Sequence, residues 1–303
     1  MRLIAILSCA LLAAPLAAAQ TPPTPPVAPA APTFVLTAPS YARYARASEV
    51  QLRDVVAYVR VRPENRSDVS VAIINNGPLP APRLRLSGRR LIVDGGMRRQ
   101  IRNCEVEGGA GFEVRTGRFG TVEGSQIPTI ELRVPQAAVV AVNGAVRLRM
   151  APAQSAVLRL DGCGDGDVER VAEGAEISVS GSSELRVFDV GALEAAVAGS
   201  SNLRIGVVRD GLTVSLAGSG GVAAARADGE TSIALQGSGD VLVRDGRATT
   251  LSVAIAGSGN VIHNGTAQSL DAAIFGSGDV HVRQVSGEIS RSTIGSGDVI
   301  IGR

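Results

Sequence analysis

Apolar and polar residues alternate along most of the chain after residue 135, in short runs that return at regular intervals. Leu251, Val253 and Ile255 are separated by single polar or small residues, and a similar run spans 270–274. A period of two places every second side chain on the same face of an extended strand. We therefore predict an all-β fold whose short strands are apolar on one face and polar on the other.

A glycine-rich motif follows each of these runs and recurs every 18–20 residues. In its clearest copies, Gly-Ser-Gly is followed by Asp or Asn. The copies begin at Gly181, Gly199, Gly218, Gly237, Gly257, Gly276 and Gly295. A weaker copy, GDGD, begins at Gly164, and Gly144 marks an earlier, degenerate one. Such a period is typical of a solenoid, in which each coil buries its apolar face on its neighbours. We predict a parallel β-solenoid with coils of about 19 residues.

The motif suits a sharp corner between strands. Glycine allows a positive φ or a close backbone approach, and we expect a positive φ at corner glycines such as Gly278. Asp, Asn and Ser can bond to neighbouring amides that stacked corners would otherwise leave unpaired. We therefore interpret the repeated acids as a structural turn column, together with the corner glycines; the column comprises Gly237, Gly257, Gly276, Gly295, Asp240, Asp279 and Asp298. In the final repeat Arg291 and Thr293 replace apolar residues, which predicts an end that blocks further strand addition.

The chain divides into four predicted segments. Residues 1–19 have the features of a secretory signal peptide, with Arg2 before an apolar stretch and small residues up to Ala19. A membrane anchor is the rival interpretation, and acylation at Cys9 is a third. Residues 20–40 are a proline-rich linker. Residues 41–134 are an irregular β segment that forms the N-terminal coils and cap, and residues 135–303 are the regular solenoid.

Composition restricts the partners. The chain has no tryptophan and no lysine, so its core consists of aliphatic residues and its basic side chains are arginines, apart from two histidines. Arginines are in excess in 41–150, whereas acids are in excess in 151–303, which makes nucleic acid an improbable partner for an exported chain. The densest basic run extends from Arg83 to Arg102. It is a solvated face or a surface for an anionic glycan or lipid.

No arrangement of residues indicates a catalytic, cofactor or metal site. One acid per coil supplies too few oxygen ligands for calcium, which takes 6–8. His263 and His281 are expected on opposite faces, so they do not form a metal pair. We predict a non-enzymatic protein without cofactor. The enzymatic alternative is a polysaccharide lyase or hydrolase, which a close acid pair facing a groove outside the corner columns would favour.

Cys104 and Cys163 are the cysteines that remain after signal cleavage. Export to an oxidising compartment favours a disulfide between them. If residue 104 were part of the regular stack, it would lie about three coils, or ~14 Å, from residue 163, which exceeds the reach of a disulfide. A bridge therefore requires segment 84–110 to fold back against the first regular coil. We predict this bridge, with two buried thiols as the alternative.

The tandem GSGDV motifs and the segment IELRVPQAAVVAVNGAVRLRM at 130–150 resemble the family described as putative auto-transporter adhesin, head GIN domain. The resemblance spans roughly residues 48–303 and implies a right-handed parallel β-solenoid with an adhesin-like role outside the bacterial cytoplasm. The chain ends in GSGDVIIGR, without a C-terminal run of membrane strands, so we expect periplasmic retention as readily as a surface location. We predict an exported interaction module whose partner is a cell-envelope glycan or protein, with no transmembrane segment after signal cleavage.

Overall fold

The structure is a computed structural model that describes residues 41–75, 77–107 and 111–302. The predicted signal peptide and the whole of the proline-rich linker lie outside these residues. Within them, no helix has the length and apolar character needed to cross a bilayer.

The N-terminal part contains strands of 3 to 16 residues and one turn of 3-10 helix. These are β1 (Ala42–Tyr44), β2 (Glu49–Glu64), β3 (Val69–Ile74), β4 (Arg83–Ser87), β5 (Arg90–Asp94), β6 (Ile101–Glu107), β7 (Gly111–Thr116), β8 (Gly120–Glu123), η1 (Gly124–Gln126) and β9 (Thr129–Pro135). β2 pairs in parallel with β5, β9 and β10, so it joins the cap to the stack. β6, β7 and β8 form a separate antiparallel sheet, here called the hairpin sheet.

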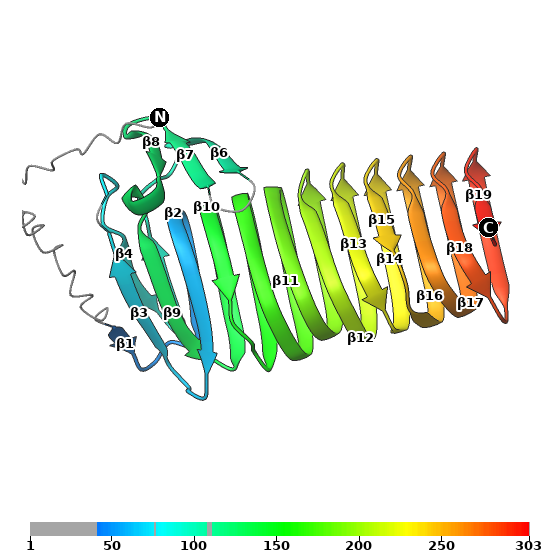
Figure 1. The fold of residues 1–303 in the computed structure, drawn as a ribbon, viewed down its shortest axis with the longest axis horizontal. Coiled ribbons are helices and arrows are strands. Elements are labelled where there is room, and N and C mark those ends of the chain that lie inside the picture. The colour runs from blue at the N-terminus through cyan, green and yellow to red at the C-terminus, as the bar shows by residue number, and fades with distance from the viewer. Residues whose placement is uncertain (1–40, 76, 108–110, 303) are drawn as a thin grey trace, which may run out of the picture. The chain divides into compact units, whose positions relative to one another are not determined.

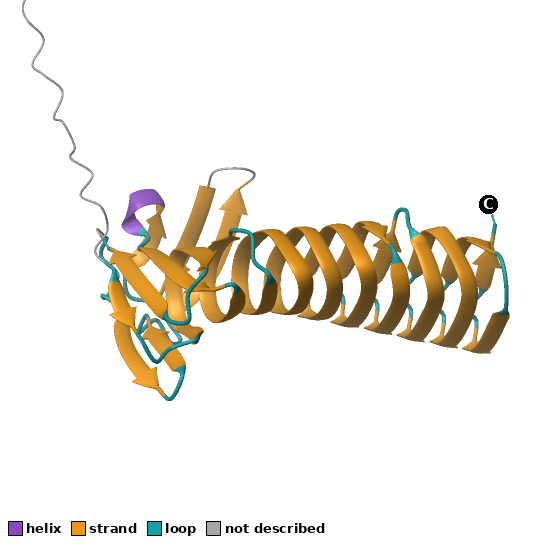
Figure 2. Cartoon of the chain, turned by 90° about the horizontal axis from the view of Figure 1, so that it is seen from below, coloured by secondary structure: helices purple, strands orange, loops and turns teal. Residues whose placement is uncertain are grey.

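The remaining strands stack in parallel as the coils of a solenoid (Figure 1). They are β10 (Ala137–Met150), β11 (Ser155–Gly199), β12 (Asn202–Gly218), β13 (Gly221–Ala227), β14 (Gly229–Gly237), β15 (Asp240–Val243), β16 (Arg247–Gly257), β17 (Val261–Gly276), β18 (Val280–Val285), β19 (Ile289–Gly295) and β20 (Val299–Ile301). Figure 2 shows successive coils as parallel turns of one ribbon. The predicted parallel β-solenoid is confirmed.

Aliphatic columns fill the interior of the coils. In one column Leu216, Leu235, Ile255 and Ile274 are in register on successive coils, and each is at most 3% exposed. Each inward residue therefore stacks on its counterpart one coil away, about 4.8 Å along the stack. The thin core suits a chain without tryptophan, because each coil buries its apolar face against its neighbours.

One column of glycines runs the length of the stack, and its members have φ angles from +77° to +144°. They are Gly144, Gly162, Gly181, Gly199, Gly218, Gly237, Gly257, Gly276 and Gly295. A Cβ added at any of the last eight would lie 2.0–2.7 Å from the carbonyl oxygen of the preceding glycine. The column requires glycine both for its backbone conformation and for space.

Two details of the predicted corners are wrong. The corner before Gly181 begins at Gly162, not at Gly164, because Gly162 is the residue in register with Gly144. The acid of that corner is therefore Asp165. Gly278 has no positive φ; it is required because an added Cβ would lie 2.0 Å from the carbonyl oxygen of Gly259.

Coil length varies at the second corner of the coil. From β11 onward, the register shifts between neighbouring coils fall between Val190 and Ala192, between Gly229 and Thr231, and between His263 and Thr266. The glycine column stays in register across the same coils. Extra residues are thus accommodated at the second corner.

His263 lies inside the aliphatic core, between Val243 and Val282 of the adjacent coils, and its side chain is fully buried. Neither ring nitrogen has a hydrogen-bond partner among the described residues. Burial lowers the pKa of His263, because the charged ring would lose its hydration.

We expect the protein to lose stability on acidification through His263. The unfolded chain takes up a proton near pH ~6.5, whereas the folded chain does so at lower pH, so the unfolded state binds more protons as the pH falls below that value. The His263→Val variant should lack this contribution. The measurement is the unfolding midpoint in denaturant between about pH 7.5 and 5, with His281→Val as control. An unchanged pH dependence in His263→Val would contradict the expectation.

Candidate functional site

Four corner residues on successive coils, here called the acid column, are linked by hydrogen bonds: Asp240, Asn260, Asp279 and Asp298. The Asp240 carboxylate accepts a hydrogen bond from the Asn260 amide at 2.8 Å, the Asn260 side chain accepts one from Asp279 at 3.0 Å, and the Asp279 carboxylate accepts one from Asp298 at 2.8 Å. Each corner side chain thus binds the backbone of the next coil. This accounts for the column without any ligand.

We expect the double variant Asp279→Asn/Asp298→Asn to bind any ligand of the parent protein with unchanged affinity. Asparagine retains an acceptor oxygen, and Asn260 already fills this role in the same column. Binding of the same ligand by the variant and the parent protein tests this. A loss of binding would give these acids a function that the hydrogen bonds do not explain.

The residue that follows the corner glycine differs where the hairpin sheet covers the corner. The position after the corner glycine is Ser182 in one coil and serine in the later ones, but it is Ala145 and Cys163 in the coils next to the hairpin sheet. Ala145 is buried with Val56 and Phe112 in a second apolar cluster, against which Cys163 also packs. Apolar residues replace serine here because the hairpin sheet covers the corner.

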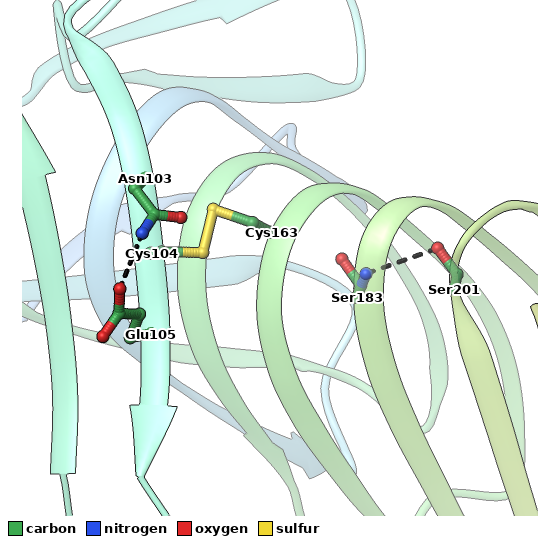
Figure 3. Close-up of a disulfide and its surroundings, with 6 residues drawn as sticks. All are labelled: Asn103, Cys104, Glu105, Cys163, Ser183 and Ser201. Carbon is green, nitrogen blue, oxygen red and sulfur yellow. Dashed lines mark hydrogen bonds between the residues drawn. A yellow bond between two sulfur atoms is a disulfide. The ribbon is translucent and has the colours of Figure 1, made fainter.

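Cys104 of β6 and Cys163 of β11 form a disulfide in the structure, with their Cα atoms 6.2 Å apart (Figure 3). Cys104 lies on the hairpin sheet and outside the stack. The distance of about three coils, which would separate Cys104 from Cys163 if residue 104 were part of the stack, therefore does not apply. The presence of this bridge in the mature protein remains a prediction.

A charged groove lies beside the disulfide. Its volume is about 550 Å³, and Cys104 is on its margin. Strand alternation points Arg147 and Arg149 outward from β10, because Val146, Leu148 and Met150 are buried. In the next coil Asp165 is in register with Arg147, and Asp167 with Arg149. Basic and acidic side chains therefore face each other across neighbouring strands.

One further coil extends the groove. Glu184 and Arg186 line it, and their side chains are 2.8 Å apart at the closest ion-pair atoms. On the other side, Arg147 and Arg149 also line a cavity of about 560 Å³ with Arg60, Ser125 and Thr129. The polar surface consequently crosses several coils, along the direction in which the coils stack.

Three buried polar atoms at the groove have no hydrogen-bond partner among the described residues: Nε of Arg147, Oδ1 of Asp165 and Oγ of Ser183. Nε of Arg147 forms an ion pair with Oδ2 of Asp165 at 3.3 Å, while Oδ1 of the same carboxylate has no hydrogen-bond partner. Buried polar groups are usually hydrogen-bonded, so these atoms are unsatisfied polar groups beside the groove.

Burial raises the pKa of Asp165, an effect that the neighbouring Arg147 opposes and the Asp167 carboxylate reinforces. Asp165 belongs to the corner column, whereas Asp167, two residues later, faces the groove outside it. The repeat pattern does not reveal this pair, because it begins the corner at Gly164, whereas the structure begins it at Gly162. The motif GCGD at 162–165, with cysteine in the serine position, contained the necessary signal.

The two histidines lie as expected from their register. His263 is inside the core, and His281 is on the outward side of β18. Within the described residues, no three His, Cys, Asp or Glu side chains are grouped so as to hold a metal ion.

The stacked corners, the aliphatic columns and the charged groove define a parallel β-solenoid with an outward-facing polar groove. Residues 207–302 match the family described as "Putative auto-transporter adhesin, head GIN domain". The resemblance predicted from the GSGD repeats is confirmed over this segment. No curated protein matches the chain.

Three solved structures are similar to this chain. A putative adhesin from Parabacteroides distasonis is 16% identical, with 86% of this chain and 96% of that chain covered, at a TM-score of 0.54. A putative lipid binding protein from the same organism is 17% identical, with 88% of this chain and 97% of that chain covered, at a TM-score of 0.43. A putative adhesin from Bacteroides fragilis is 14% identical, with 86% of this chain and 96% of that chain covered, at a TM-score of 0.39. At these identities the first structure shows a shared fold alone.

Proposed function

We propose that the protein is exported and binds a polysaccharide of the bacterial cell envelope in the charged groove, without cleaving it. The observation that carries the proposal is the polar lining of the groove, in which Nε of Arg147, Oδ1 of Asp165 and Oγ of Ser183 are buried without a hydrogen bond. Sugar hydroxyls both donate and accept hydrogen bonds, so they can satisfy a guanidinium, a carboxylate and a serine at once. The groove crosses several coils, which suits an extended chain.

The test is binding of envelope polysaccharides to the exported protein by calorimetry. The double variant Arg149→Gln/Asp167→Asn should weaken binding at least about tenfold, because it removes charge-assisted hydrogen bonds from both sides of the groove. Asp279→Asn/Asp298→Asn is the matched control on the corner column. The proposal is wrong if no polysaccharide binds, or if both variants bind as the parent protein does.

Location can be tested separately. Export predicts that the protein isolated from cells begins near Gln20, and protease treatment of intact cells distinguishes a surface location from the periplasm. Digestion before the outer membrane is opened indicates the surface. Recovery of the full-length chain in the cytoplasm would contradict export.

Polysaccharide cleavage is the second candidate function, and the raised pKa of Asp165 beside Asp167 in the groove favours it, although Asp165 belongs to a corner. Glycoside hydrolysis uses two carboxyl groups, of which the proton donor has a raised pKa. Asp165 meets this condition because it is partly buried beside a second carboxylate. Release of reducing ends that Asp165→Asn abolishes would establish cleavage. Binding without release would support the module proposed first.

A further inference from the structure

The outward face of the sheet that β4, β5 and β2 form is basic. β5 pairs in parallel with β2 and antiparallel with β4, so residues in register share a face of the sheet. Leu91 and Val93 of β5 are buried in the core, and Leu86 and Leu84 of β4 lie opposite them on the same side. The outward face consists of Arg85 and Ser87 of β4, Arg90 and Ile92 of β5, and Glu49, Gln51 and Arg53 of β2.

A cleft of about 450 Å³ is open on this outward face. Ile92 forms its floor: it is only 5% exposed, although it points away from the core and lies outside both apolar clusters of the described residues. Ile92 is in register with Arg85 on one side and with Gln51 on the other, so long side chains cover it. The charged residues around this floor are Arg53, Arg85, Arg89, Arg90 and Glu49.

Three arginines of the cleft, Arg53, Arg85 and Arg89, have no acidic partner within the part of the chain that the structure describes. Arg53 donates a hydrogen bond to the side-chain oxygen of Gln51 at 2.8 Å, and Arg89 donates one to the hydroxyl of Ser48 at 3.1 Å. A neutral acceptor orients a guanidinium group but leaves its charge uncompensated. These groups are therefore positioned for an anion.

The acids on this face compensate the arginines only in part. Glu49 forms an ion pair with Arg90 at 3.1 Å, within the cleft itself. Asp94 is in register with Arg53, but it does not line the cleft, and its carboxylate accepts a hydrogen bond from the amide of Gly96 at 2.8 Å. Four arginines and one glutamate leave the lining with a net positive charge.

The chemistry of this lining suits a phosphate group better than a carboxylate. A phosphate monoester has a charge of about −1.5 to −2 at neutral pH and three strong acceptor oxygens. A carboxylate has a single charge and two oxygens, so it satisfies fewer of the three uncompensated guanidinium groups. Each guanidinium donates two parallel hydrogen bonds to phosphate oxygens, and the hydroxyl of Ser87 is a further donor in the lining.

We propose that this cleft binds a phosphate group, either as free phosphate or as a monoester, through Arg53, Arg85 and Arg89. The cleft shares no lining residue with the charged groove, so the proposal does not rest on polysaccharide binding. It adds a phosphorylated ligand to the partners of the protein.

The experiment is calorimetric titration of the protein with inorganic phosphate, glucose 6-phosphate, glucuronate and glucose. We expect the two phosphates to bind, glucuronate to bind at least about tenfold more weakly, and glucose not to bind. Tighter binding of glucose 6-phosphate than of inorganic phosphate supports a monoester as the ligand, and the reverse order supports free phosphate. The proposal is overturned if neither phosphate binds, or if glucuronate binds as tightly as glucose 6-phosphate.

Two variants of the cleft should change phosphate affinity in opposite directions. Arg53→Gln/Arg85→Gln should weaken binding at least about tenfold, because it removes two charged donors. Glu49→Gln should strengthen binding, because it releases Arg90 from its ion pair. Circular dichroism checks that both variants fold.

The matched controls lie on the regular coils and change the net charge by the same amounts. They are Arg247→Gln/Arg283→Gln and Glu194→Gln, at exposed positions. Unchanged phosphate affinity in the controls supports a site in the cleft. Changes as large as those of the cleft variants would reduce the effect to net charge, and the proposed site would be wrong.

Discussion

Gly276→Ala should destabilise the protein by more than about 3 kcal/mol, above the range of most single substitutions. The residue has a φ of +137°, and an added Cβ would lie 2.1 Å from the carbonyl oxygen of Gly257. Backbone strain and a clash with the preceding coil therefore act together. Denaturant unfolding followed by circular dichroism measures the loss, and hydrogen exchange at 257–276 shows whether it begins at this corner.

Two other glycines separate the causes. Gly88 has a φ of +61° with nothing within 4 Å of an added Cβ, so Gly88→Ala tests the conformation alone and should cost about 1–2 kcal/mol. Gly278 has the close approach without a positive φ, so Gly278→Ala tests the clash alone. If Gly276→Ala costs no more than Gly88→Ala, stacking of the corners does not require glycine for space.

Removing the disulfide should loosen the attachment of the hairpin sheet to the solenoid. The bridge closes a loop across a sequence separation of 59 residues, which corresponds to roughly 4 kcal/mol in the chain-entropy model. In the double variant Cys104→Ser/Cys163→Ser we expect faster hydrogen exchange in β6, β7 and β8. Exchange at 257–276 should stay unchanged, because those coils pair only with their own neighbours. Unchanged exchange in the hairpin sheet would contradict the prediction.

The bond itself can be tested by mass. Alkylation of the protein isolated from cells, under denaturing and non-reducing conditions, should leave Cys104 and Cys163 unmodified. Modification of both would remove the bridge and leave the apolar cluster around Phe112 as the main attachment of the hairpin sheet.

The regular coils could be predicted because their signals repeat. Each GSG corner has the same neighbours in every coil, so one interpretation of Gly237 or Gly276 applies to all. The corner at 162–165 departs from the consensus, because cysteine replaces serine where the hairpin sheet covers it. The repeat pattern therefore places this corner two residues too late. The groove depended on that register, which brings Asp165 next to Arg147 in β10.

The hairpin sheet could be predicted only in outline. The cysteines indicated that segment 84–110 folds back, but its partner strands, β7 and β8, lie beyond that segment. The contacts that attach it are long-range, such as the edge-to-face pair of Tyr58 and Phe112 at 5.7 Å. No local pattern in the sequence encodes such pairs.

The two kinds of corner differ in how much they restrict change over evolutionary time. A residue gained or lost beside Gly276 would move the corner glycines of every later coil out of register. A residue gained after Asp245 lies at the second corner, where coil lengths already differ. Relatives should therefore diverge in length along one edge of the solenoid and stay uniform along the other. The variable edge is also the place at which a loop or an affinity tag can be grafted without disturbing the stack.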